Sequence, residues 1–226
     1  MIGAVAAGLT VAGLAAHGTW HRNSWIFGPV LNHLPTADVS ITFDDGPNPN
    51  ATPIILDVLK REGVKATFFV LGRHADRWPA LVKRMADEGH QLGNHGYFHR
   101  KLHRRTPGYV RDDLTRGAEA IERASGARPR VFRAPHGFRN PWVTPIARSL
   151  GERTIGWSLG VWDSARPGAD EIVRRALDGM RAGSILLLHD GDGYDADGDR
   201  MQTAAALPGI IAGLRSRGFH FAVLPD

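Results

Sequence analysis

The sequence predicts an α/β fold of one domain, in which about seven parallel strands form a sheet or a barrel. First, strand-like and helix-like segments alternate from Asp38 to the end of the 226-residue chain. Second, polar residues stand where the predicted strands end, which is where parallel α/β folds gather their working residues. Third, 42% of the residues are hydrophobic, and no repeat, linker or low-complexity tract divides the chain.

Short apolar or β-branched runs predict strands at residues 38–43, 66–71, 90–94, 130–133, 153–157, 184–189 and 219–224. Helical patterns lie between them, at residues 52–62, 78–88, 108–124, 142–150, 169–180 and 201–217. Pro79 starts the second helix, and four helices are followed by Gly63, Gly89, Gly151 and Gly218. We therefore expect a folded domain over residues 38–226, preceded by an apolar segment and a lead-in over residues 1–37.

The N-terminal segment allows three interpretations: an export signal, a weak membrane anchor or a packed helix. Residues 1–16 are apolar apart from Thr10, but they are shorter than a spanning helix and lack the cations that begin a signal peptide. Trp20, His21, Arg22 and Trp25 follow, as at a membrane interface. We favour export or membrane association through residues 1–20, facing the cell envelope, with a cytoplasmic location as the alternative. The sequence does not indicate an oligomeric state.

The charge and the cysteine content limit the classes of binding partner and metal site that the chain can have. Lysine and arginine total 28 against 23 acidic residues, but no basic block is interleaved with aromatic residues. We therefore expect no nucleic-acid partner, whereas a basic surface favours anionic envelope polymers. Cysteine is absent, so disulfides and thiolate metal sites are excluded.

Asp44 and Asp45 close the strand at residues 38–43, just before Gly46 and Pro47. Adjacent carboxylates repel each other, so a cation bound by one while the other handles protons explains the pair. An Asx-turn that closes the strand explains it equally well.

His95 and His99 are spaced by four residues, so on one helical turn they share a face and can share a metal ion. Two histidines and a carboxylate suit one divalent ion, with zinc first and iron, cobalt or nickel as alternatives. The alternative is a pair of surface histidines. The other histidines, including His74 and His103, we interpret as surface or packing residues.

Two further strand ends carry candidate catalytic residues. His189 ends the apolar run Leu186–Leu188 and is suited to donate a proton, with Leu187 on the same side of the strand. Arg133 precedes a proline turn, where it can hold a carboxylate through two parallel hydrogen bonds. A histidine bonded to its own loop and an ordinary surface arginine are the alternatives.

In this order the segments resemble the polysaccharide deacetylase family of metal-dependent carbohydrate esterases. The resemblance spans about residues 39–224 and rests on TFDDGP (42–47), HGYFH (95–99), FRAPHG (132–137), WSLGVWD (157–163) and LLLHD (186–190). It implies a distorted parallel (β/α) barrel, and removal of N-acetyl groups from a glycan such as chitooligosaccharide or peptidoglycan.

The resemblance also implies residue roles. Asp44 would be the general base, and the metal ligands would be Asp45, His95 and His99. His189 would protonate the leaving amine, paired with Asp163, while Arg133 would orient Asp44. The substrate would meet the backbone N–H of His136, the side chain of Leu187 and a pocket wall that includes Trp162.

The chain departs from the family pattern at four positions. Gly96 replaces a serine or threonine after the first histidine, and His136 replaces a tyrosine. Gly160 and Ser164 replace an acid and a tryptophan, although Trp162 lies just before Asp163. No metal ligand, base or acid is lost, but the pocket wall is rebuilt. Hydrolysis of a non-sugar amide and glycan binding without catalysis remain the alternative functions.

Five aspartates follow His189 within residues 190–199. Arg200 and Ala206 stand where a calcium loop requires glycine and glutamate, so we expect a solvated loop that flanks the cleft and raises the basicity of His189.

Overall fold

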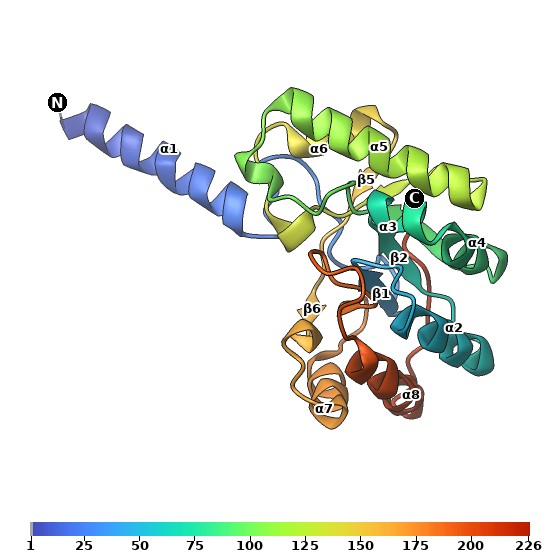
Figure 1. The fold of residues 1–226 in the computed structure, drawn as a ribbon. Coiled ribbons are helices and arrows are strands. Elements are labelled where there is room, and N and C mark those ends of the chain that lie inside the picture. The colour runs from blue at the N-terminus through green and yellow to red at the C-terminus, as the bar shows by residue number, and fades with distance from the viewer. Residues whose placement is uncertain (1) are drawn as a thin grey trace.

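The computed structural model describes residues 2–226, with side chains for residue 10 and residues 12–226. It confirms a single α/β domain built on a curled, seven-stranded parallel sheet (Figure 1). The strands are β1 (Ser40–Asp44), β2 (Thr67–Val70), β3 (Gln91–Asn94), β4 (Val131–Phe132), β5 (Arg153–Thr154), β6 (Leu159–Gly160) and β7 (Ile185–His189). Their order in the sheet is β5-β4-β3-β2-β1-β7-β6, and every pairing is parallel.

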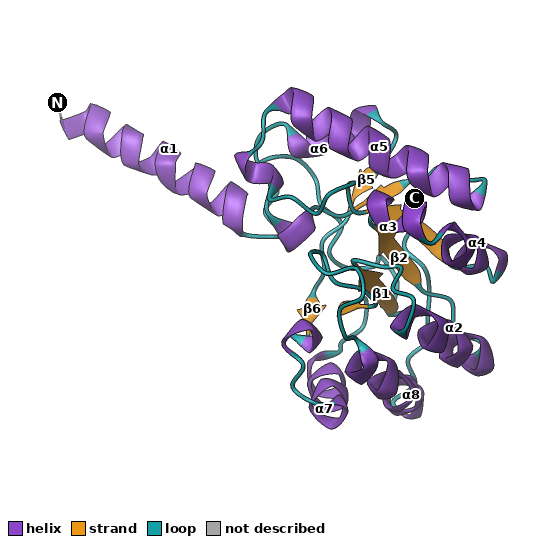
Figure 2. Ribbon diagram, viewed as in Figure 1, coloured by secondary structure: helices purple, strands orange, loops and turns teal. Residues whose placement is uncertain are grey.

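Helices surround the outer face of the curled sheet (Figure 2). They are α2 (Ala51–Glu62), α3 (Gly72–Arg77), α4 (Pro79–Asp87), α5 (Pro107–Ser125), α6 (Val143–Ser149), α7 (Ala169–Gly179) and α8 (Met201–Ser216). Neighbouring helices touch in the order α7, α8, α2, α4, α5, α6. Short 3₁₀ turns cover Leu102–Arg104, Pro135–Gly137 and Asp163–Ala165.

The two-residue period of the strands separates an apolar outer face from a polar inner face. Ile41 and Phe43 point outward into the main core, together with Leu186 and Leu188 of β7. The alternate residues point inward, where Arg133 bonds to Thr42 and Asp44. The sequence therefore builds a barrel wall from one set of positions and a polar interior from the other.

The two edges of the sheet lie close together, so the sheet is nearly a barrel. β5 and β6 stand at opposite edges, yet only residues 155–158 connect them. A chain of this length spans at most about 18 Å. Residues of the lead-in occupy the seam between the edges. Leu31 forms a parallel bridge with Ile155, His33 an antiparallel bridge with Ser184, and Asn23 donates a hydrogen bond to the Trp157 carbonyl at 3.0 Å.

Two strand predictions were wrong in detail. The segment at residues 219–224 is not a sheet strand, because both sides of β1 are already paired with β2 and β7. It crosses the amino ends of the strands instead, with one bridge from Phe221 to Val39 and a hydrogen bond from Leu224 to Gln91. The sheet still has seven strands, because β6, which the sequence did not predict, takes the seventh place.

Helix α1 (Ile2–Trp20) precedes the lead-in and extends away from the barrel (Figure 1). Its C-terminal end meets the domain, where the Thr19 carbonyl accepts a hydrogen bond from the Arg139 backbone. Among the residues that the structure describes, no helix combines the length and apolarity that a membrane crossing requires. Export and membrane association stay predictions.

Candidate active site

Polar residues from several strands meet in a cavity of about 670 Å³. Asp44 and His189 are paired in register at the carboxyl ends of β1 and β7, while His95 follows β3 and Arg133 follows β4. The expected gathering of strand-end residues is therefore observed. The cavity is lined by nine of the ten predicted site residues: Asp44, Asp45, His95, His99, His136, Trp162, Asp163, Leu187 and His189. Arg133 lies fully buried outside this lining.

Asp45, His95 and His99 form a buried cluster whose ligand atoms all lie within 4.8 Å of one another. Asp45 Oδ1 is 3.3 Å from His95 Nε2 and 3.1 Å from His99 Nε2. Burial alone would raise the pKa of Asp45, but His99 and His95 together hold it well below its usual range. The cluster is the single such group of His, Cys, Asp and Glu among the described residues.

The hydrogen-bond partners of the cluster residues are consistent with a bound divalent metal ion. Asp45 Oδ1 is buried without a hydrogen-bond partner, as expected of an atom that faces a cation. The Arg133 carbonyl lies 2.8 Å from His95 Nδ1, which directs His95 Nε2 toward the other ligands. Asp45, His95 and His99 would therefore hold the ion.

Asp44 lies beside this cluster but is held by a different partner. Its Oδ1 accepts a hydrogen bond from Arg133 Nη1 at 2.7 Å, and its Oδ2 lies 3.7 Å from His95 Nε2. Arg133 does not grip Asp44 through two parallel bonds as expected, because Nη2 donates to the Gly156 carbonyl instead. The guanidinium also packs over the Phe69 ring at 4.1 Å. Asp44 is thus fixed on one oxygen while the other faces the cluster.

The half-buried His189 and the buried Asp163 form a second pair. The His189 Nδ1 lies 2.9 Å from Asp163 Oδ1, and the His189 backbone N–H donates to Asp163 Oδ2. Burial would lower the pKa of His189, but Asp163 more than offsets it and raises the pKa to about 9. A protonated His189 can therefore donate a proton from Nε2 into the cavity.

Four cavity residues have left-handed backbone conformations, which residues other than glycine rarely adopt. The φ angles are 74° for Asp45, 56° for His99, 61° for His136 and 58° for Trp162. Each costs about 1–3 kcal/mol, so the surrounding fold must hold these side chains in place. Trp162 is 73% exposed at the rim of the cavity.

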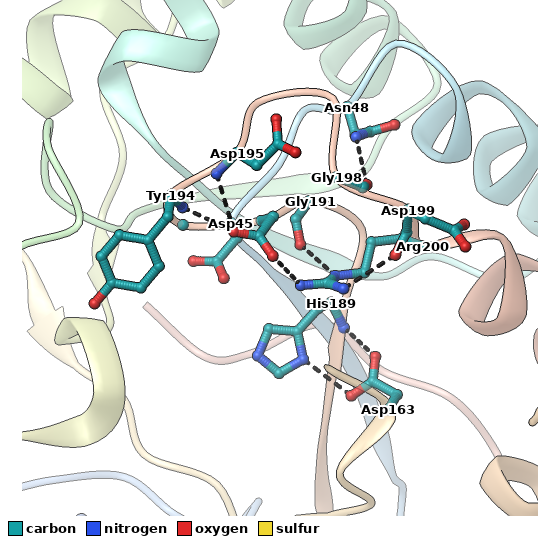
Figure 3. A network of polar contacts seen from close by, with 12 residues as sticks. Asp45, Asn48, Asp163, His189, Gly191, Tyr194, Asp195, Gly198, Asp199 and Arg200 are labelled. Carbon is teal, nitrogen blue, oxygen red and sulfur yellow. Dashed lines mark hydrogen bonds and ion pairs between the residues drawn. The ribbon is translucent and has the colours of Figure 1, made fainter. Parts of the chain in front are cut away.

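The loop over residues 190–200 contributes Asp192, Tyr194 and Arg200 to the cavity lining and is less solvated than expected. Figure 3 shows the polar contacts that hold it. Asp190 is fully buried against Thr52, and Arg200 holds Asp192 at 2.7 Å and the Gly191 carbonyl. The loop aspartates do not account for the basicity of His189, whose pKa is raised by Asp163, Asp45 and Asp44. That part of the prediction was wrong.

Glycine suits the backbone conformation and the limited space at position 96. It has a φ of 75°, and a Cβ at this position would collide with Asp113 Oδ2. Asp113, on α5, accepts hydrogen bonds from the backbone N–H groups of Tyr97 and Phe98 at 3.1 and 3.2 Å. A buried carboxylate therefore holds the turn between the two histidines.

Sequence reasoning missed three residues around the site. His74 is buried, and its Nδ1 lies 2.8 Å from the carbonyl of Asp45. The Tyr194 hydroxyl lies 3.0 Å from His136 Nε2, and Arg22 lines the cavity. No local pattern marks them, because their partners are distant in sequence.

Glu152 gives a pH-dependent prediction. It is buried beside the Asn94 amide, and burial raises its pKa from 4.5 to about 8. The folded protein therefore keeps a proton that the unfolded chain loses, so Glu152 makes stability fall as pH rises from about 4.5 to about 8. We therefore compare the Tm of Glu152→Gln with that of the wild type. We expect the difference, variant minus wild type, to be at least about 3 °C larger at pH 9 than at pH 5.

Calorimetry at both pH values tests this prediction, with Glu119→Gln on the exposed face of α5 as the control. A Tm difference between Glu152→Gln and the wild type that stays constant with pH would contradict it.

The fold and the site together define the class of protein. It is a hydrolase whose candidate metal centre lies at the carboxyl ends of an open parallel barrel. Residues 32–155 match the family model described as "Polysaccharide deacetylase". The chain belongs to the polysaccharide deacetylase family.

Known relatives agree with this assignment. A chitooligosaccharide deacetylase of Bradyrhizobium sp. (strain ANU 289) is 41% identical over 200 residues, covering 84% of this chain and 90% of the relative. The structure of the Bc1960 peptidoglycan N-acetylglucosamine deacetylase is similar with a TM-score of 0.79 and 34% identity, covering 87% and 90% of the two chains. A pseudoenzyme of the same family from Bacillus anthracis has a TM-score of 0.78 and 28% identity, with 87% and 66% covered.

Proposed function

We propose that this chain removes N-acetyl groups from an acetylated glycan, with one zinc ion held by Asp45, His95 and His99. The observation that carries the proposal is the arrangement of Asp44 and His189 on adjacent strands, beside the same three-ligand cluster. A divalent cation there would polarise the acetamide carbonyl and lower the pKa of a water molecule. Relatives named as chitooligosaccharide and peptidoglycan deacetylases support the substrate class.

In this proposal Asp44 is the general base. Its free oxygen, Oδ2, lies on the side of His95, where an attacking water would stand. Arg133 keeps the other oxygen occupied, so Asp44 takes the proton from the water at a fixed position. His189 then gives its Nε2 proton to the nitrogen of the departing amine, and Asp163 holds the ring in the required orientation.

The remaining predicted residues shape the acetyl pocket. The left-handed turn at His136 offers its backbone N–H to the developing oxyanion, a donor of the kind that contributes a few kcal/mol. Leu187 lies two residues before His189 on the same face of β7 and lines the cavity, so it would contact the acetyl methyl group. Trp162 projects at the rim, where an aromatic ring can cover a sugar.

A substrate panel tests the proposal. We expect zinc-loaded protein to release acetate from N-acetylglucosamine tetramers or peptidoglycan fragments, and the same preparation to lose this activity after chelation. Small N-acetyl amides serve as the comparison. Acetate release from those amides alone would overturn the glycan assignment, and glycan binding without any acetate release would overturn catalysis.

A further inference from the structure

The cavity has a cationic end that the proposed mechanism does not use. Its lining includes Arg22, from the lead-in, and Lys101, just after the metal-ligand segment. Both lie next to the turn at residues 136–138. Arg22 Cβ lies in contact range of Gly137, and Lys101 lines the cavity together with His136 and Phe138 of this turn. Two cations therefore flank one turn at the cavity wall.

These cations differ from the other charged groups of the cavity because they have no counter-ion. Asp44 is paired with Arg133, Asp163 with His189 and Asp192 with Arg200, while Asp45 belongs to the cluster. Among the residues that the structure describes, neither Arg22 nor Lys101 forms an ion pair. The unmatched charge of the cavity is thus positive and lies at this end.

Arg22 is also held in position. Its guanidinium stacks over the Trp157 ring at 5.1 Å, and its Nε donates to the Trp157 carbonyl at 3.4 Å. The two Nη groups have no hydrogen-bond partner among the described residues. A planar guanidinium with both Nη groups free is suited to a carboxylate, which it can bind through two parallel hydrogen bonds.

We propose that Arg22 and Lys101 form a carboxylate subsite, which selects glycans carrying an acidic substituent next to the acetylated sugar. This inference rests on the proposed deacetylation, because it places the carboxylate relative to the same cavity. It gives the lead-in a role in substrate choice. A neutral chitooligosaccharide would be turned over without this contact.

The test compares two substrates that differ only in charge: an N-acetylglucosamine–N-acetylmuramic acid tetrasaccharide and its methyl ester. We expect a higher kcat/KM for the free acid in the wild type. Arg22→Gln and Lys101→Met should each reduce this preference by about threefold and together by about tenfold, the range of exposed charge pairs. Raising the salt concentration should weaken the wild-type preference in the same direction.

Controls separate charge from folding. Lys60→Met removes one exposed cation from α2, away from the cavity, and should leave the preference unchanged. Arg22→Lys retains the charge but loses the planar pair of donors, so its preference should lie between those of the wild type and Arg22→Gln. Thermal unfolding reports whether the variants fold.

Turnover of N-acetylglucosamine tetramers separates this inference from the proposed function. If the wild type deacetylates the tetramer, the acid and the ester but shows no preference for the acid, the carboxylate subsite is overturned and deacetylation stands. An equal preference in Arg22→Gln/Lys101→Met also overturns it. If no glycan is deacetylated, the proposed function itself fails.

Discussion

Asp44→Asn is expected to lower kcat for acetate release by about 10²- to 10⁴-fold, the range of general acid–base catalysis. Asparagine keeps the shape of the side chain but cannot accept a proton from water. Its amide oxygen can still accept the hydrogen bond from Arg133 Nη1. Because Asp45, His95 and His99 are unchanged, zinc content should stay at the wild-type level. Steady-state kinetics and metal analysis on one preparation measure both quantities.

The control for this variant is Asp112→Asn, an exposed aspartate on α5 that should leave kcat unchanged. Arg133 is fully buried, so the loss of its counter-ion also destabilises the fold, and assays must be run well below the measured Tm. Full activity in Asp44→Asn would remove Asp44 from the role of base. Loss of zinc together with activity would place Asp44 among the metal ligands instead.

His99→Ala is expected to abolish both zinc binding and acetate release. The variant leaves two of the three ligand side chains, and the polarisation that a cation supplies is worth several kcal/mol. We therefore expect kcat to fall by at least about 10³-fold. Chelation should lower the Tm of the wild type, because an ion that binds the folded state stabilises it, but should not lower that of His99→Ala.

The matched control is His103→Ala, four residues further along the same segment. His103 packs edge-on against Phe138 at 5.2 Å and does not belong to the ligand cluster, so its variant should keep the zinc and the chelator response. A zinc content near the wild-type level in His99→Ala would show that the ion binds elsewhere.

Much of the site follows from the sequence because its signals are local. Asp44, Asp45 and His189 stand at the ends of short apolar strands, and the carboxyl ends of parallel strands meet at one edge of the sheet. The spacing of His95 and His99 predicts a shared ligand face, and the two side chains do meet at Asp45. The helical turn expected for them was wrong, because residues 95–99 form an irregular turn after β3. Patterns of this kind need no knowledge of distant partners.

The remainder depends on contacts between distant segments. A two-residue strand such as β6 has no pattern of its own, whereas residues 219–224 look like a strand but find both sides of β1 occupied. Asp113 on α5 bonds to the backbone of Tyr97, and His74 on α3 contacts the carbonyl of Asp45. Neither contact produces a spacing that sequence reasoning could detect. The solvation of the loop at residues 190–200 was mispredicted for the same reason, since Thr52 and Asn48 bury parts of it.

The seam between β5 and β6 has a consequence for how such chains diverge. Residues 22–33 fill the space between the two edges of the sheet, and Arg22 among them also lines the cavity. Grafting this segment from one relative onto another would exchange the contacts that close the barrel together with Arg22, the residue of the proposed carboxylate subsite. A fragment that begins at residue 38 would lack these contacts between β5 and β6, although it would keep all three proposed metal ligands.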